Sequence, residues 1–498
     1  MRQFRRTHFA AFLVVVGIYI ASRFWGLTSS CLWFDELFSV HAAEHDWSSI
    51  WSFISLDLIH PPLFYIILKV WILTGGESLL WLRLLPVLFG VIAIFPFIYL
   101  CNELKISFWT RLLAFLLVAV NGSLIKYSQE VRMYSLLMCL SLFSMWLFTR
   151  YFQKGKGIVA FTIINILLVW THYFGWFVVV SEVVAILIFQ RIKWRAVILM
   201  FGVALASFVP WIISVAIAAR EGPGLSQNIG WMTRPGVAAV LQLKLALLEP
   251  FYFQASNADP VSIYRISAPL LLLAAAGLIL FLLGWAKHPS EEKRAFEIAA
   301  IFAGLPLLAA FVVSWLFPYS VWGTRHLIIA FAPASILIAL TLSGIPVSNL
   351  RVAAVTIVVL FTGYAFVLQA QRPAPQYIWC AWEQLLERIE PGTEAHIYAT
   401  EDVIAYHLWF AARKNPRVRI SKREAGVPED PAYFLPRGFS GVDRLGLADP
   451  NESEFWIAYR SSDGTMPAAV VQKGYAVVEE QDISIQNTHA VLVRLRKD

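Results

Sequence analysis

Residues 351–369 read RVAAVTIVVLFTGYAFVLQ, an apolar run whose one charge is at its first position. A membrane-spanning helix needs about 20 mostly apolar residues, so this run predicts a span. From Gln371 onward charged residues become frequent, and apolar residues recur at the spacing of short helices and strands. The change predicts a boundary between a membrane body, residues 1–370, and a soluble domain, residues 371–498.

The composition supports this division. Hydrophobic residues make up 58% of the chain and charged residues only 15%, whereas soluble proteins carry about 25% charged residues. The last 128 positions hold 33 of the 73 charged residues. The body has 25 basic and 15 acidic residues and the tail has 15 and 18, so the net charge of +7 comes from the body. Basic residues between apolar segments indicate membrane topology and not a nucleic-acid-binding surface.

Other apolar runs of similar length predict further spans, and the first of them begins after three arginines near the N-terminus. No small-x-small cleavage site follows that run, so we expect an uncleaved first span and not a removed signal. Eleven spans are expected, at 8–27, 79–101, 110–126, 135–149, 158–171, 174–190, 196–217, 268–286, 295–317, 327–344 and 351–369.

The segment from Pro61 to Leu73 decides the topology of everything after it. It is apolar but only about two-thirds of the length of a span. If it crossed, Lys105, Arg191 and Lys193 would lie outside, against the tendency of basic residues to stay in the cytoplasm. We therefore expect it to lie at the interface, with the N-terminus inside and the C-terminal domain outside. Polar residues that could build one site then collect at the outer ends of the spans: Asp35, Glu36, His60, Arg83, Lys126, Glu130, Arg132, His172, Tyr173, Arg325 and His326.

The tail predicts a soluble α/β domain. Helices are expected at Trp379 to Ile389 and Val403 to Ala412. Strands are expected at Ala395 to Ala399, Phe455 to Arg460, Tyr475 to Glu480 and Ala490 to Leu495.

Two adjacent carboxylates, Asp35 and Glu36, follow the first span among large apolar side chains. They could be interfacial acids that face water. Alternatively, a carboxylate partly withdrawn from water binds a proton more tightly and suits the role of a base toward a hydroxyl nucleophile. Adjacent side chains point different ways, so we expect one of the two to do the chemistry.

Two more motifs lie on the same predicted face. His60 precedes Pro61 and Pro62, which favour the start of a helix, and its imidazole could simply be satisfied by nearby backbone. The segment from Ser128 to Tyr134 reads SQEVRMY at the outer end of a span. Its Glu130 and Arg132 could pair with each other, or they could act on a ligand, because charges at this depth are costly unless paired or functional.

Together these motifs resemble the GT-C glycosyltransferases. The residues that carry the resemblance are the Asp35-Glu36 pair, the His-Pro-Pro-Leu start at 60, the Leu-Arg-Leu at 82 and SQEVRMY, with a looser likeness at Trp322 to His326. The closest likeness is to the bacterial branch related to protein O-mannosyltransferases and to the lipid A aminoarabinose transferase. It implies a polytopic α-helical membrane protein of GT-C fold, multi-pass in the cell inner membrane, with a C-terminal soluble α/β domain.

The resemblance also implies transfer of a sugar, with inversion, from a polyprenyl-phosphate donor to a lipid, glycan or protein acceptor at the outer face. Asp35 would be the base and Glu36 an orienting or acceptor-binding group. Arg83, Arg132 and Arg325 are candidates for the donor phosphate, because a guanidinium matches phosphate with a forked geometry, and Lys126 is a weaker candidate. The residues near the sugar or acceptor would be His60, Glu130, Tyr134, His172 and Tyr173.

Several points stay open. His172 and Tyr173 could equally be an interfacial pair, since aromatic residues collect at that depth. Some related enzymes bind a divalent metal, which Glu130 with His60 or His172 could ligate, but no metal spacing can be read. Glu182 lies deep in a span and is expected to be bonded between helices, outside the site. The four cysteines show neither metal spacing nor a disulfide-rich pattern, so we assign no role to Cys31, Cys101, Cys139 and Cys380.

Two other functions compete with this interpretation. A ligase or polymerase that uses a diphosphate-linked glycan would need similar groups. A membrane transporter also carries intramembrane charges and broken spans, but it would be expected to show two related halves and charges near mid-membrane. The charges here collect at the rim, and no repeat is visible.

Overall fold

A computed structural model gives the fold of the chain. The residues that it describes are 2–189, 194–221, 229–230, 232–251, 263–371, 376–390, 392–423, 436, 439–445, 452–467, 474–485 and 487–498. Arg191 and Lys193, which entered the topology argument, lie outside these ranges.

The chain forms two compact units. The first holds Met1–Leu27 and Leu58–Pro373, and the second holds Thr28–Asp57 and Ala374–Asp498. The expected division at residue 370 thus falls close to the boundary between them. The grouping differs in one respect: residues 28–57, expected in an outer loop of the body, belong to the unit of the C-terminal domain.

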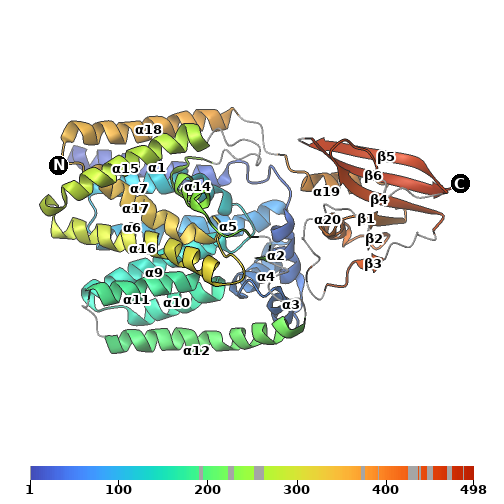
Figure 1. Ribbon diagram of the computed structural model, residues 1–498, viewed down its shortest axis with the longest axis horizontal. Helices are drawn as coiled ribbons and strands as arrows, with labels where there is room; N and C mark the ends of the chain where they lie inside the picture. The colour runs from blue at the N-terminus through green and yellow to red at the C-terminus, as the bar shows by residue number, and fades with distance from the viewer. Residues whose placement is uncertain are drawn as a thin grey trace. The chain divides into compact units, whose positions relative to one another are not determined.

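The first unit is entirely helical in its described part, and most of its long helices run side by side (Figure 1). Eight stretches in it are long and apolar enough to cross a membrane. In order they correspond to α1 (Arg2–Phe24), α5 and α6 (Leu79–Ile92 and Ile94–Glu103), α9 (Tyr134–Lys154), α12 (Trp194–Ala218), α15 (Ala268–Leu283), α16 (Ser290–Leu316), α17 with the preceding η4 (Phe331–Ser343 and His326–Ala330) and α18 (Ser348–Ala370).

Shorter apolar helices occupy the other expected spans. They are α7 (Phe108–Val120), α10 (Ile158–Thr171) and α11 (Gly175–Phe189). The expected span 110–126 is divided because Asn121 ends α7 and caps the next helix, α8 (Gly122–Tyr127). Two more short helices are α4 (Leu63–Gly75), which follows Pro61 and Pro62, and α14 (Val237–Leu248). The helix α4 stops short of a full span, as its sequence predicted.

Buried polar groups join the helices of this unit. Arg23, fully buried in α1, donates from Nη1 to the carbonyl of Ala119 (2.5 Å) and from Nη2 to that of Val118 (3.0 Å), so it satisfies carbonyls at the C-terminus of α7. Glu182 of α11 accepts a hydrogen bond from Asn165 Nδ2 of α10 (2.8 Å) and another from Ser144 of α9. Glu182 is therefore bonded between helices, as expected.

The second unit contains α2 (Phe34–Glu44) and α3 (Ile50–Asp57) from the first segment, and a mixed sheet flanked by α19 (Trp379–Glu387) and α20 (Asp402–Ala412). The strand order is β3-β2-β1-β4-β6-β5 (Figure 1). The neighbours β3, β2, β1 and β4 pair in parallel, and β6 pairs antiparallel with both β4 and β5. The strands are β1 (Ala395–Ala399), β2 (Val418–Arg423), β3 (Asp443–Leu445), β4 (Glu454–Ser461), β5 (Tyr475–Ile485) and β6 (Thr488–Lys497).

The expected helices and strands of the tail are confirmed within a few residues, and two strands, β2 and β3, were not foreseen. The core between β1, β4 and β6 consists of alternate buried side chains, as a packed sheet face requires. Its members are Tyr398, Phe455, Ile457, Tyr459, Val491, Val493 and Leu495.

Candidate active site

The turn from Ser128 to Met133 carries the SQEVRMY motif between α8 and α9. Its shape is fixed locally, because the amide of Arg132 donates to the carbonyl of Glu130 (2.7 Å). It is also fastened to the end of α1, since Gln129 Nε2 donates to the carbonyls of Arg23 (3.1 Å) and Trp25 (2.8 Å). Arg132 is buried and lies just before α9. The sequence predicts that this end of α9 faces outward.

Arg132 contacts the His-Pro-Pro motif. Its Nη2 donates to His60 Nε2 (3.1 Å), and its Nη1 lies 3.4 Å from the hydroxyl of Tyr65 on α4. Since a guanidinium only donates, His60 must accept through Nε2. The structure therefore brings together two motifs about 70 positions apart and gives His60 a side-chain partner.

Two further histidines lie next to His60. The ring of His172 lies 5.6 Å from that of His60 and 5.3 Å from that of His326, between centroids. The Tyr134 ring lies 6.4 Å from His172 and 6.2 Å from His326. Four elements far apart in sequence thus contribute rings to one cluster, which we call the histidine cluster: His60, Tyr134, His172 and His326.

The surroundings of the histidine cluster favour the neutral form of its imidazoles. The amide of Phe174 donates to His172 Nδ1 (3.1 Å), which leaves the proton of the neutral ring on Nε2. Burial lowers the pKa of His172 well below its usual value, and the nearby His60, Arg132 and Arg325 lower it further. Among the described residues, neither His172 Nε2 nor His326 Nδ1 has a hydrogen-bond partner, although both are buried. These two nitrogens are therefore available to bind another molecule.

Arg132 and Arg325 both influence this cluster, because the charge of each lowers the pKa of His172. Arg325 precedes the short helix η4, whose first residue is His326. Lys126 lies 3.9 Å from Glu130, one turn along the chain. The carboxylate of Glu130, which the sequence left open to pair with Arg132 or to act on a ligand, thus has Lys126 as a charged partner.

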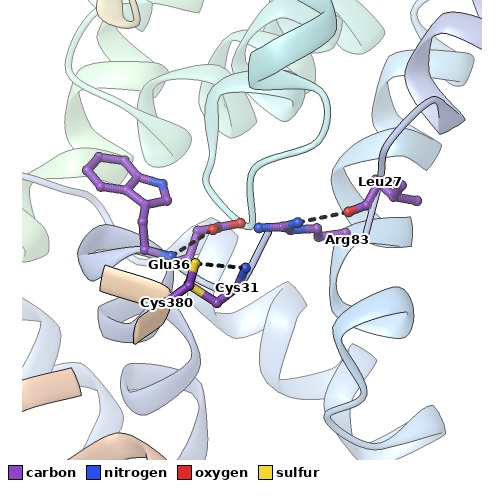
Figure 2. The surroundings of a disulfide bond; sticks show 6 residues. Leu27, Cys31, Glu36, Arg83 and Cys380 are labelled. Carbon is purple, nitrogen blue, oxygen red and sulfur yellow. Dashed lines mark hydrogen bonds between the residues drawn. A yellow bond between two sulfur atoms is a disulfide. The ribbon is translucent and has the colours of Figure 1, made fainter. Parts of the chain in front are cut away.

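Arg83 and Tyr173 form hydrogen bonds to backbone carbonyls of the body. Arg83, buried on α5, donates from Nη1 to the carbonyl of Leu27 (2.8 Å), as Figure 2 shows. The hydroxyl of Tyr173 donates to the carbonyl of Leu58 (3.3 Å) and accepts from Trp211 Nε1 (3.1 Å). Leu27 and Leu58 are the last and first residues of the body on either side of the segment 28–57. Two predicted site residues therefore anchor the two ends of that segment.

Asp35 and Glu36 lie in the first turn of α2, in the second unit. The Glu36 carboxylate accepts from the amide of Trp33 (3.1 Å), the residue just before the helix, and its side chain is fully buried. An acid at this position satisfies a free amide of the helix start and interacts favourably with the helix dipole. Asp35 is partly exposed. The two acids thus differ in surroundings, because Glu36 is fully buried at the helix start and Asp35 is partly exposed.

The second unit also corrects the treatment of the cysteines. Cys31 and Cys380, to which no role was assigned, form a disulfide between the segment before α2 and α19 (Figure 2). The amide of Cys31 also donates to Cys380 Sγ (3.3 Å). The pairing was hidden because 349 positions separate the two residues. Cys101 and Cys139 are buried free thiols.

The sequence also missed residues near the cluster. The motif at Trp322 to His326 predicts no role for His326, and no sequence motif marks Tyr65. Glu249, just after α14, is buried, and Oε1 of its carboxylate has no partner among the described residues. Asn121 Nδ2 holds this region by donating to the carbonyls of Ala246 (2.9 Å) and Leu247 (3.2 Å). Burial raises the pKa of Glu249 to about 7, and Lys126 opposes the rise. No local pattern marks Glu249.

A divalent metal was left open by the sequence. Within the described ranges, no group of three or more His, Cys, Asp and Glu side chains could hold a metal ion. We therefore assign no ligands and derive no step through a metal.

The class of protein follows from the architecture. A membrane body of many helices, a cluster of basic and aromatic side chains and a small C-terminal sheet domain form the GT-C fold expected from the motifs. Solved structures of membrane glycosyltransferases share this fold.

Two of those proteins are the following. ArnT from Cupriavidus metallidurans in the apo state is similar over 97% of this chain and 97% of its own, with a TM-score of 0.58 and 12% identity. The structure of the same enzyme bound to undecaprenyl phosphate is similar with a TM-score of 0.55 and 12% identity. The apo oligosaccharyltransferase of Archaeoglobus fulgidus is similar over 81% of this chain, with a TM-score of 0.50 and 14% identity, and this chain spans 64% of its length. No family model and no curated protein matches the sequence.

Proposed function

We propose that this chain is an integral membrane glycosyltransferase that moves a sugar from a polyprenyl-phosphate donor to a lipid, glycan or protein acceptor. The donor has a long isoprenoid, which needs apolar helices, and a phosphodiester, which needs cations. The similar ArnT structure has been solved with undecaprenyl phosphate, which supports a donor of this class. The sugar and the acceptor are not specified by any residue described above.

The reaction is a displacement at the anomeric carbon. The acceptor hydroxyl oxygen forms a bond to this carbon on the face opposite the phosphate, and the bond from carbon to phosphate oxygen breaks, which inverts the configuration. The hydroxyl proton passes to a carboxylate, and the electron pair leaves with polyprenyl phosphate. A base and cations for the developing negative charge are the minimum equipment.

One observation carries the proposal. Arg132, in contact with His60, and Arg325 both act electrostatically on His172, which belongs to a cluster of buried neutral rings with two unpartnered nitrogens. Positive charge beside uncommitted hydrogen-bonding groups suits a sugar linked to phosphate.

The roles that we propose follow the contacts. Arg132 and Arg325 bind the donor phosphate, with Lys126 nearby as a weaker cation. Arg83 remains a candidate for the phosphate in addition to its bond to Leu27. His60, Tyr134 and His172 would line the sugar, while Glu130 orients Lys126 and Tyr173 supports the wall of the site.

Asp35 is the proposed base and Glu36 an orienting group. The support is their difference in surroundings, because Glu36 already bonds to the start of α2 and Asp35 is partly exposed. A base must reach its proton through a hydrogen bond, so the more open acid suits the role better.

For the location we propose an inner (plasma) membrane protein with its N-terminus in the cytoplasm and its C-terminal domain outside. The Cys31–Cys380 disulfide supports the outer position of both segments, since disulfides persist in oxidising compartments. Cysteines introduced at the exposed positions Lys156 and Asp463 provide the test. An impermeant maleimide applied to intact cells should label position 463 and not position 156, and the opposite pattern would invert the topology.

The test of function is turnover by the purified chain in detergent. A panel of polyprenyl-phosphate sugars and one diphosphate-linked glycan is incubated with the protein and a mixed acceptor fraction, and the release of polyprenyl phosphate or diphosphate is measured. Arg132→Gln should lower the release by about 10²-fold, whereas Arg351→Gln, near the start of α18, should leave it unchanged. Release of diphosphate alone would favour the ligase alternative, and uptake into proteoliposomes without cleavage would favour a transporter.

A further inference from the structure

The segment that carries the proposed base is built onto the C-terminal domain. Residues 28–57 form one compact unit with residues 374–498, although they are inserted between α1 and α4 of the body. Bonds from Arg83 and Tyr173 of the body fasten its two ends, at Leu27 and Leu58. The helix α2 lies between these ends and packs within the second unit.

Four contacts hold α2 along its length. The Cys31–Cys380 bond lies just before its start. The Phe34 ring packs against Tyr406 with centroids 5.2 Å apart, and His41 Nδ1 lies 3.0 Å from the Tyr406 hydroxyl. At its end, Arg413 pairs with Glu44 at 3.0 Å.

These partners come mainly from one helix of the C-terminal domain. Tyr406 lies in α20, and Arg413 is its C-terminal cap residue. The His41 ring is also packed by Trp409, at 4.7 Å, and by Phe439, at 5.2 Å. A covalent bond, an aromatic cluster and an ion pair at the start, middle and end of one helix leave it little freedom to move independently of α20.

We infer that the C-terminal domain is a positioning element for the base: it fixes α2, and through α2 Asp35, by the Cys31–Cys380 disulfide and the contacts of α20. The inference rests on the proposed function for its catalytic consequence. Cys31, Cys380, Tyr406 and Arg413 are positioning residues, since they act through α2. Loss of the disulfide should lower kcat while donor affinity, which depends on the cations of the body, stays the same.

The experiment compares Cys380→Ser with Cys101→Ser, a matched change of a buried free thiol in α6. Peptide mapping without reductant verifies the bond in the parent and its loss in Cys380→Ser. We expect kcat of Cys380→Ser to fall about tenfold with a donor Kd within twofold of the parent, and faster hydrogen exchange of the α2 amides. Cys101→Ser should match the parent in all three measurements.

A second arm uses the folded parent protein, in case Cys380→Ser folds poorly. A phosphine reductant converts the disulfide to two thiols and is itself oxidised to the phosphine oxide, and reoxidation should restore both kcat and the slow exchange. A parent-like kcat and parent-like α2 exchange, with the bond demonstrably absent, would overturn the inference.

The two failures can be told apart. If the parent turns over no donor, the proposed function fails, while α2 exchange still reports whether the disulfide holds the helix. If the parent is active and loss of the bond changes only thermal stability, the disulfide is merely structural and the inference fails. A cycle of Glu44→Gln and Arg413→Gln adds a test, because residues that act through one contact should give non-additive losses in kcat.

Discussion

The turn from Ser128 to Met133 and the helix α2 both carry charges that the sequence placed at the outer rim, but they are held in different ways. Within the turn, the backbone amide of Arg132 donates to the backbone carbonyl of Glu130, and the side chain of Gln129 donates to the carbonyl of Arg23 at the end of α1. The helix α2 is held by residues far away in sequence, among them Cys380, which is 349 positions from Cys31, and Arg413, which is 369 positions from Glu44. The comparison teaches that the location of a charged residue follows from hydropathy, whereas its role depends on partners that only folding supplies.

The largest expected effect concerns the carboxylates of α2. Asp35→Asn keeps the shape of the side chain but removes the base, so turnover should fall roughly 10²- to 10⁴-fold. The matched control is Asp46→Asn, an exposed acid in the same segment, which should keep parental turnover. If Glu36→Gln gave the large loss and Asp35→Asn did not, the roles of the two acids would be reversed.

Next in size is the pair of arginines of the body. Arg132→Gln and Arg325→Gln should each lower turnover by about 10²-fold, because charge-assisted contacts matter most as charge develops on the leaving phosphate. Groups that act on one phosphate should also be non-additive, so the double variant should lose less than the product of the single losses. The measurements are donor affinity and kcat in a double-mutant cycle. Strictly additive losses would remove one arginine from the site.

A smaller effect concerns the stability of the body. Burial raises the pKa of Glu249 to about 7, above the 4.5 of an ordinary glutamate, so the folded state binds the proton more tightly than the unfolded state. This contribution is fully present below about pH 4.5 and is lost as the pH rises through about 7. Glu249→Gln cannot ionise and should therefore be more stable than the parent at pH 8, by at most on the order of 3 kcal/mol.

The measurement is thermal unfolding in detergent at pH 5 and pH 8. The difference in Tm between these pH values should shrink in Glu249→Gln. An unchanged pH dependence would mean that Glu249 titrates normally in the folded chain.

The stability of the second unit should depend on pH in the opposite direction. Burial, then His45 and Arg413, lower the pKa of His41 to about 3, so the folded state binds the proton less tightly than the unfolded state. The corresponding stability is present above the unfolded pKa of 6.5 and is lost as the pH falls toward 3. At pH 5 the loss should reach about 2 kcal/mol.

Hydrogen exchange of α2 and α20 at pH 5 and pH 8 measures this effect. His41→Gln keeps a hydrogen-bonding group for Tyr406 but does not titrate, and it should weaken the dependence. Equal acid sensitivity in both chains would place the responsible group elsewhere, for example at the buried His407, whose pKa is also lowered to about 3.

The sequence by itself determined the membrane body, the soluble α/β tail and the short helix after Pro62. Long apolar runs, proline positions and strand alternation are local properties, and lipid allows few alternatives to helices. The sequence also predicts that the charges of the body lie at the ends of its spans, because charged side chains avoid the apolar interior of the membrane.

Only the tertiary structure decided which of those residues meet. It joined Arg132 to His60, paired Glu130 with Lys126, gave Arg83 and Tyr173 anchoring bonds and brought Cys31 to Cys380. It also grouped α2 with α20 and buried Glu249. Such pairings depend on how helices pack across hundreds of positions, and a single sequence carries no local signal for contacts at that distance.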